Sequence, residues 1–176
     1  MKENFKIKIG EEFKPSTKLK KIYRIYLLSL IIIGVLSWYI PFMIFVPLLE
    51  VKIGISIPLW LIIIFIIYWV EKLYESISYK LTEDEIIMKR GVWFKKKSIV
   101  PYLKITNIDI TQGPLLRKFG LANINIQTAG YSGYSHSYTG AEIKLVGIEE
   151  FEKLEELIME FVKKKQQIIK KTSERE

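Results

Sequence analysis

The chain has 176 residues, a formal net charge of +8 and no cysteine. The lack of cysteine excludes a disulfide framework, a thiolate metal site and a cysteine nucleophile. Hydrophobic residues make up 49% of the chain, but they are concentrated in residues 25–49 and 53–70, which contain no charged residue. In such a chain the positive charge points to membrane orientation and anionic lipid, and no nucleic-acid partner is expected.

The first apolar run, residues 25–49, is longer than the roughly 20 residues that a membrane-spanning helix needs. Pro41 and Pro47 each remove a backbone donor, so the helix is expected to end or kink near Ile40. Residues 41–49 would then lie at the far interface. A cleaved signal peptide is the competing interpretation, but the run is too long and lacks a small-residue cleavage site.

The second run, residues 53–70, is rich in isoleucine, and Pro58 is expected in the first turn of its helix. Only Glu50 and Lys52 are charged between the runs, so the two spans predict a hairpin with a minimal loop. We expect a basic N-terminal segment at 1–21 and a hairpin at 22–73, with spans of about 22–42 and 54–72. The competing interpretation, a buried helix pair in a soluble protein, is disfavoured by the length of both runs.

Lysine and arginine in the flanking segments predict the orientation. Basic residues are numerous before the first span and after the second, whereas the middle loop has one lysine. Both termini and the domain after the hairpin are therefore expected in the cytoplasm, in a multi-pass cell-membrane protein. Because no charge lies inside either run, the helices are expected to be an anchor or a packing surface and not an ion path.

After residue 74 the apolar pattern changes to a period of two, which indicates half-buried strands. We expect a strand ending at Leu81, a turn at Thr82-Glu83-Asp84 and a strand at Glu85–Arg90. Further strands are expected at residues 93–100, through Ile108 and Ile110 to about Thr111, at 123–128 and at 142–146, with a turn at 112–114.

The last element has a helical period. Phe151, Leu154, Ile158, Phe161 and Val162 fall on one face of an amphipathic helix. Glutamates lie near its start and lysines 163–165 near its expected end, which suits the helix dipole. Short antiparallel strands closed by one helix favour a small barrel or sandwich. Residues 166–176 are expected to be a basic tail, either a frayed helix or a lipid-facing extension.

Three segments carry a family resemblance: Ile-Val-Pro-Tyr-Leu-Lys-Ile-Thr-Asn-Ile at 99–108, Gln-Gly-Pro-Leu-Leu-Arg-Lys-Phe-Gly-Leu at 112–121, and Ile-Gln-Thr-Ala-Gly at 126–130. Together they resemble the membrane-anchored bacterial pleckstrin-homology (PH) family, in its YdbS-like group. Lys104 and Asn107 depart from the arginine-glutamine of many members, and the Gly/Ser/Tyr loop after Ala129 is longer.

The resemblance implies a transmembrane hairpin followed, at 74–165, by a mainly-β PH-like barrel of about seven antiparallel strands with a C-terminal amphipathic helix. It implies less about activity, because this fold hosts many unrelated functions. Some members of the family are associated with tolerance to membrane-active peptides or bacteriocins.

No catalytic, cofactor-binding or metal-binding residue is predicted. His136 is the only histidine and lies in a polar loop, which favours a solvated side chain over a metal ligand. Glu83, Asp84 and Glu85 are adjacent carboxylates in a turn, where they are expected to face water. No phosphate-binding glycine loop or nucleophile motif occurs, so the chain is not expected to be an enzyme.

The densest basic cluster of the domain flanks Gly91 and Trp93 and is expected at a hairpin end. Its side chains either provide solubility and orientation or bind anionic lipid. Its members are Lys89, Arg90, Lys95, Lys96 and Lys97.

Arg117 either bonds backbone carbonyls at the rim of the domain or faces a partner. The loop at 130–140 has the tyrosine, glycine and serine composition of adaptable binding loops. Tyr131, Tyr134 and Tyr138 are therefore candidates for a partner surface, and a disordered loop is the alternative.

These patterns favour a non-enzymatic, membrane-tethered interaction module at the cytoplasmic leaflet. Its expected partners are anionic lipid in the bilayer and another small membrane protein of the same system. The alternative is an accessory or immunity subunit of a transport or bacteriocin-resistance system. A third hypothesis is an enzyme that acts at the membrane interface.

Overall fold

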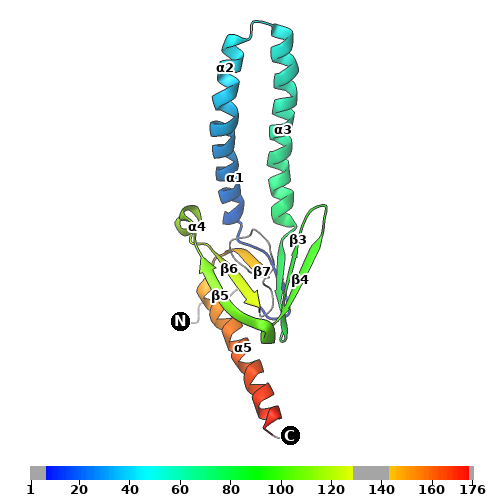
Figure 1. Ribbon diagram of the computed structural model, residues 1–176, viewed down its shortest axis with the longest axis vertical. Coiled ribbons are helices and arrows are strands. Elements are labelled where there is room, and N and C mark those ends of the chain that lie inside the picture. The colour runs from blue at the N-terminus through cyan, green and yellow to red at the C-terminus, as the bar shows by residue number, and fades with distance from the viewer. Residues whose placement is uncertain (1–6, 129–142, 175–176) are drawn as a thin grey trace. The chain divides into compact units, whose positions relative to one another are not determined.

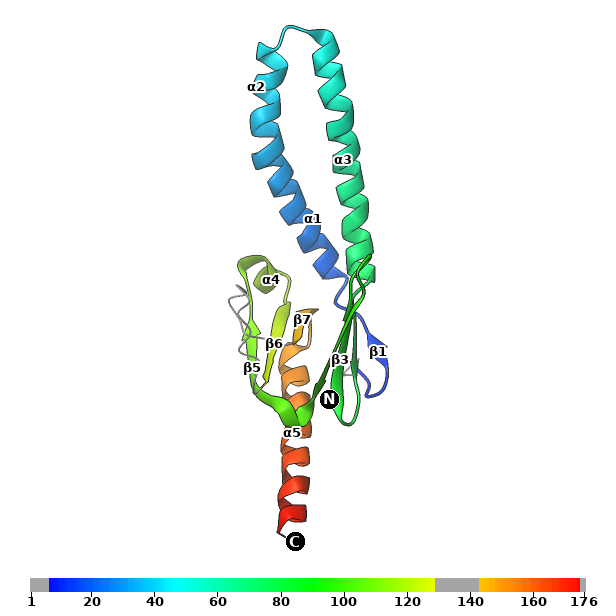
Figure 2. The ribbon, with the colours of Figure 1, turned by 45° about the vertical axis from the view of Figure 1, so that its right-hand side comes forward.

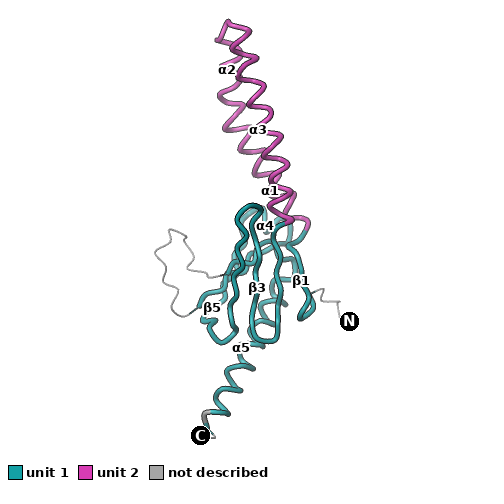
Figure 3. The backbone as a smooth tube through the Cα atoms, turned by 90° about the vertical axis from the view of Figure 1, so that its right-hand side faces the viewer, with its two compact units in different colours: residues 1–16, 76–176 teal, residues 17–75 magenta. Residues whose placement is uncertain are grey.

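The computed structural model describes residues 7–128 and 143–174 (Figure 1). The chain divides into two compact units (Figure 3). One unit is the helical hairpin of residues 17–75, and the other combines residues 1–16 with residues 76–176. The segment that precedes the hairpin in sequence thus belongs to the same unit as the strands that follow it.

The hairpin unit consists of two long helical stretches. The first contains α1 (Lys18–Leu30), the π-helical segment η1 (Ile31–Leu36) and α2 (Ser37–Phe45), and the second is α3 (Leu49–Glu75). They are 28 and 27 residues long and apolar enough to cross a membrane, and almost none of their most apolar stretches is buried. Apolar surface of this extent is a liability in water, and it suits helices surrounded by lipid.

Two helix bounds expected from the prolines are wrong, while the alternative expectation of a kink near Ile40 stays a prediction. The first helix does not end at Ile40, because α2 continues through Pro41 to Phe45. The expected place of Pro58, in the first turn of the second helix, is also wrong, because α3 begins at Leu49 and holds Pro58 in its interior. Proline is tolerated inside apolar membrane helices, where neighbouring groups satisfy the backbone carbonyl that it leaves without a partner.

Polar side chains join the two helices of the hairpin at two levels. The Tyr39 hydroxyl donates to the Ser56 hydroxyl at 2.8 Å. Nearer the other end, the Glu71 carboxylate accepts from the Lys20 ammonium at 2.9 Å and from the Arg24 guanidinium. In an apolar surrounding such pairs favour a fixed register between the helices.

The other unit contains two antiparallel sheets. The first has the order β1 (Glu12–Phe13), β2 (Ser78–Leu81), β3 (Glu85–Arg90) and β4 (Lys96–Pro101), and the second has the order β5 (Ile105–Thr111), β6 (Ala122–Thr128) and β7 (Ile143–Ile148). A 3₁₀ turn, η2 (Tyr102–Lys104), connects the sheets, and a short helix, α4 (Pro114–Lys118), connects β5 to β6. The predicted strand at Glu85–Arg90 is confirmed, whereas β1 and α4 were not predicted.

The two sheets are not closed into a barrel, so the expected barrel is not confirmed. A bulge provides one link between them. Near Val146 and Gly147 the pairing of β6 with β7 shifts register, which leaves backbone groups outside the ladder. The Tyr79 hydroxyl of β2 accepts from the Val146 N–H at 2.8 Å and lies 3.3 Å from the Val146 carbonyl oxygen. One side chain thereby connects the first sheet to the second.

The helix α5 (Phe151–Ser173) completes the core. Leu154, Ile158 and Val162 are buried in one cluster with residues of both sheets, as their spacing predicts. Figure 2 shows the two sheets on either side of the N-terminal half of α5. The helix continues through residue 173, so most of the expected tail belongs to it. Burial of this apolar face fixes α5 against both sheets.

Candidate functional site

The hairpin of β3 and β4 gathers all five residues of the predicted basic cluster at one end. The two strands pair from Glu85 and Pro101 to Arg90 and Lys96, and residues 91–95 form the loop. The predicted strand at 93–100 is therefore shorter than expected, since β4 begins only at Lys96. The five side chains are exposed: Lys89, Arg90, Lys95, Lys96 and Lys97.

The register places like charges directly opposite one another at this end. Lys89 pairs with Lys97, and Arg90 pairs with Lys96. Like charges directly opposite each other destabilise a pair of strands by on the order of 0.2–1 kcal/mol.

One acidic side chain offsets part of this charge. Lys89 donates to the Glu12 carboxylate of β1 at 2.5 Å, and this hydrogen bond, helped by the lysine charge, lowers the pKa of Glu12 below its ordinary value. Within the described residues no acidic side chain pairs with Arg90 or with residues 95–97. Four cations of the cluster are thus available to an external partner.

Two aromatic side chains lie in the loop between the basic residues. Trp93 is 75% exposed and Phe94 is 90% exposed. Gly91 has a φ of +112°, and a Cβ there would lie 2.0 Å from the Phe94 carbonyl oxygen. The Gly91 N–H donates to the Ser76 hydroxyl at 3.2 Å. The loop therefore needs glycine at position 91. In the sequence, the only sign of the exposed aromatic pair is a Trp-Phe dipeptide between two basic runs.

No contact among the described residues joins the other predicted contact residues to the loop end of the β3–β4 hairpin. Arg117 is exposed on α4, and only its backbone makes hydrogen bonds among the described residues, including one from its N–H to the Gly113 carbonyl. Tyr131, Tyr134 and Tyr138 lie outside the described residues, as does His136.

Residues of the acidic turn after β2 make hydrogen bonds and an ion pair within the domain. The Thr82 hydroxyl and backbone bond to Glu85, and Asp84 pairs with Lys165 of α5. Buried Tyr102 donates to the Thr82 carbonyl at 3.0 Å, and its pKa is raised by burial and by the charge of Asp84. Among the described side chains no three His, Asp or Glu residues gather to hold a metal ion.

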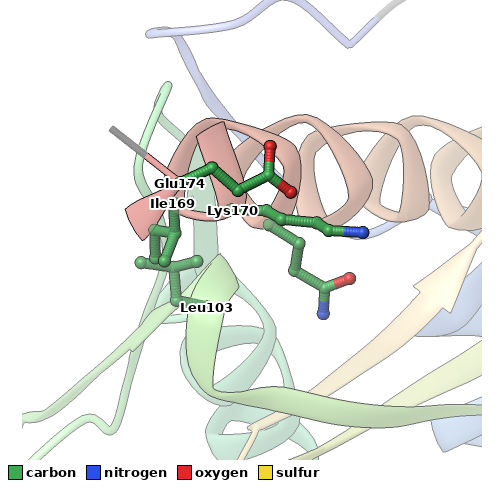
Figure 4. A pocket seen from close by; sticks show the side chains of 5 residues that line it. Leu103, Ile169, Lys170 and Glu174 are labelled. Carbon is green, nitrogen blue, oxygen red and sulfur yellow. The ribbon is translucent and has the colours of Figure 1, made fainter. Parts of the chain in front are cut away.

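A shallow pocket lies between η2 and the last turns of α5 (Figure 4). Leu103 and Ile169 provide its apolar side, and Gln166, Lys170 and Glu174 provide its polar side. No residue selected from the sequence lines it. It combines one ammonium and one carboxylate with two half-exposed apolar side chains.

Comparison with known proteins agrees with this architecture. The family model described as bacterial PH domain matches residues 17–162, which include the hairpin and the strands β2 to β7. The chain is 29% identical over 133 residues to the UPF0699 transmembrane protein YdbS of Bacillus subtilis (strain 168), which covers 73% of this chain and 80% of that protein. No solved structure matches the chain. With two apolar spans and a family match over most of its length, the chain is a membrane protein that belongs to the bacterial PH domain family.

Proposed function

We propose that this chain is a membrane-tethered interaction module, without enzymatic activity, that binds anionic lipid at the cytoplasmic leaflet. The observation that carries the proposal is the end of the β3–β4 hairpin, where five exposed cations gather in spite of two like-charge pairs across the strands. The family match and the two apolar helices support the membrane tether.

The magnitude of the electrostatic attraction supports binding to lipid. A lysine or arginine close to an anionic bilayer surface contributes about 1 kcal/mol. Arg90 and lysines 95–97 would together contribute up to about 4 kcal/mol, with Lys89 adding less because it already pairs with Glu12. The tether lowers the entropic cost further, since the domain never leaves the membrane.

The cytoplasmic placement rests on the distribution of basic residues around the two spans. Five basic residues precede or open the first span: Lys14, Lys18, Lys20, Lys21 and Arg24. The segment between the two uncharged runs has one lysine, and basic residues favour the cytoplasmic side. A reporter that is active only in the cytoplasm should be active when it is fused after Lys80. Activity of an export-dependent reporter at that position would contradict the orientation.

The lipid contact is tested with the full chain in nanodiscs. Amine-reactive labelling of lysines 95–97 should fall in nanodiscs that contain anionic lipid, compared with purely zwitterionic ones, and should recover in high salt because surface electrostatics are screened. Lys104 is the matched control, since it is exposed but follows the opposite end of β4. Equal labelling of lysines 95–97 in both lipids would refute the proposal.

A further inference from the structure

The loop between β3 and β4 exposes apolar surface as well as charge. Trp93 and Phe94 are 75% and 90% exposed, and they are adjacent in the chain. Single exposed apolar residues are common on protein surfaces and require no explanation. Here two large aromatic side chains occupy the tip of a hairpin whose strands carry cations on both sides of them.

We infer that Trp93 and Phe94 insert into the interfacial layer of the anionic leaflet, so that the hairpin end is an amphipathic wedge. The inference rests on the proposed function and adds the mode of contact. Tryptophan is enriched at the membrane interface because its ring is apolar and its N–H is polar. The flanking cations match the negative headgroups, and the aromatic pair matches the apolar layer directly beneath them.

Two features of Gly91 restrict the conformation of the loop that presents this pair. Gly91 has a left-handed φ of +112°, and any Cβ there would meet the Phe94 backbone. Its N–H is held by the Ser76 hydroxyl. A loop held in one conformation loses less entropy on insertion than a flexible one.

Chain connectivity also favours insertion. Ser76 directly follows Glu75, the last residue of α3. The hydrogen bond from Gly91 therefore joins the loop to the residue after the second candidate span. A segment tethered this closely has a high effective concentration at the bilayer surface, so modest apolar contacts are enough to populate the inserted state.

Two contributions to membrane binding should respond differently to salt. Attraction between the cations and the headgroups is screened by salt, whereas burial of aromatic surface is not. Each aromatic side chain that leaves water should raise the ratio of docked to undocked domain by roughly tenfold or more. Insertion should therefore persist in part at salt concentrations that abolish purely electrostatic docking.

The test uses Trp93 as the only tryptophan of the full chain, with Trp38, Trp60 and Trp69 replaced by phenylalanine. In nanodiscs containing anionic lipid, brominated acyl chains should quench Trp93 emission, and the emission should shift to the blue. Phe94→Ala should lower the quenching, since it removes half of the wedge. The matched control moves the tryptophan to the turn before β3, at the other end of that strand, as Glu83→Trp with Trp93→Phe. This tryptophan should stay unquenched.

The outcomes distinguish the inference from the proposed function. If lysines 95–97 are protected by anionic lipid but Trp93 remains open to aqueous quenchers, the wedge is refuted and the electrostatic contact stands. If neither lysine protection nor Trp93 quenching depends on anionic lipid, both are refuted. A Trp93 signal that changes only when a second protein is added would also overturn the wedge, in favour of a protein contact. Gly91→Ala should reduce quenching while leaving both helices in the membrane, because it disturbs only the loop.

Discussion

Replacement of Tyr79 by phenylalanine tests how the open pair of sheets is held together. The Tyr79 hydroxyl bonds the backbone of Val146, where the bulge in β7 interrupts the ladder. Tyr79 is 1% exposed, so water does not readily replace the lost hydroxyl. We expect Tyr79→Phe to destabilise the domain while leaving the two helices unaffected.

The magnitude follows from the groups left without a partner. A buried backbone N–H that loses its acceptor costs about 1–3 kcal/mol, and the removal of one hydroxyl creates almost no cavity. For a domain of about 100 residues, each kcal/mol lowers the unfolding midpoint by roughly 4–8 °C. Tyr79→Phe should therefore lower the midpoint by at least several degrees.

The assay is thermal unfolding of the full chain in nanodiscs, monitored by near-ultraviolet circular dichroism. Tyr26→Phe is the matched control, because the Tyr26 side chain is half exposed on α1 and its loss should leave the midpoint unchanged. A Tyr79→Phe midpoint equal to that of the wild type would show that the bond between the sheets contributes nothing, and the reasoning would fail.

Two further predictions concern β1 and α5. Because Lys89 lowers the pKa of Glu12 in the folded state, the stabilising contribution of this pair is present above the ordinary value of 4.5 and is lost as the pH falls through the lowered pKa. The difference in unfolding midpoint between wild type and Glu12→Gln should accordingly be largest near neutral pH and vanish in acid; a difference independent of pH would contradict the pairing. Ile158→Ala should cost about 2–5 kcal/mol in denaturant unfolding, since Ile158 is fully buried, and Met159→Ala, which changes an exposed neighbour, should cost far less. Similar losses for the two variants would place α5 differently on the sheets.

Local patterns were enough to predict the elements whose buried residues recur with a regular period along the chain. The alternation in Glu85–Arg90 predicted β3 with its bounds, because strand formation there depends on burying Ile86 and Met88 on one face. The period of α5 predicted its buried face in the same way. The two long uncharged runs predicted the two apolar helices, since length and hydropathy alone decide whether a helix can span a bilayer.

The site was only partly accessible from the sequence. The five cations could be selected as a cluster because they are close in the chain. Their arrangement as opposed pairs depends on the register of β3 and β4, and the exposure of Trp93 and Phe94 depends on the loop beginning at Gly91. The sequence predicts Trp93 as the first residue of a strand, whereas it lies in the loop before β4. Aromatic residues are common in strands, so the residue type alone favours a strand at this position.

The division of the chain into apolar spans and alternating strands follows from the sequence alone, because hydrophobic periodicity is a local property. Which distant segments meet is visible only in the folded chain. The two residues of β1 carry no strand signal of their own, and they become a strand because β2 offers a free edge to Glu12 and Phe13. The Tyr79 hydroxyl likewise connects the two sheets, between which the described strands form no pair. Such contacts depend on backbone groups left over once the local elements have formed, and no local pattern encodes where those groups will meet.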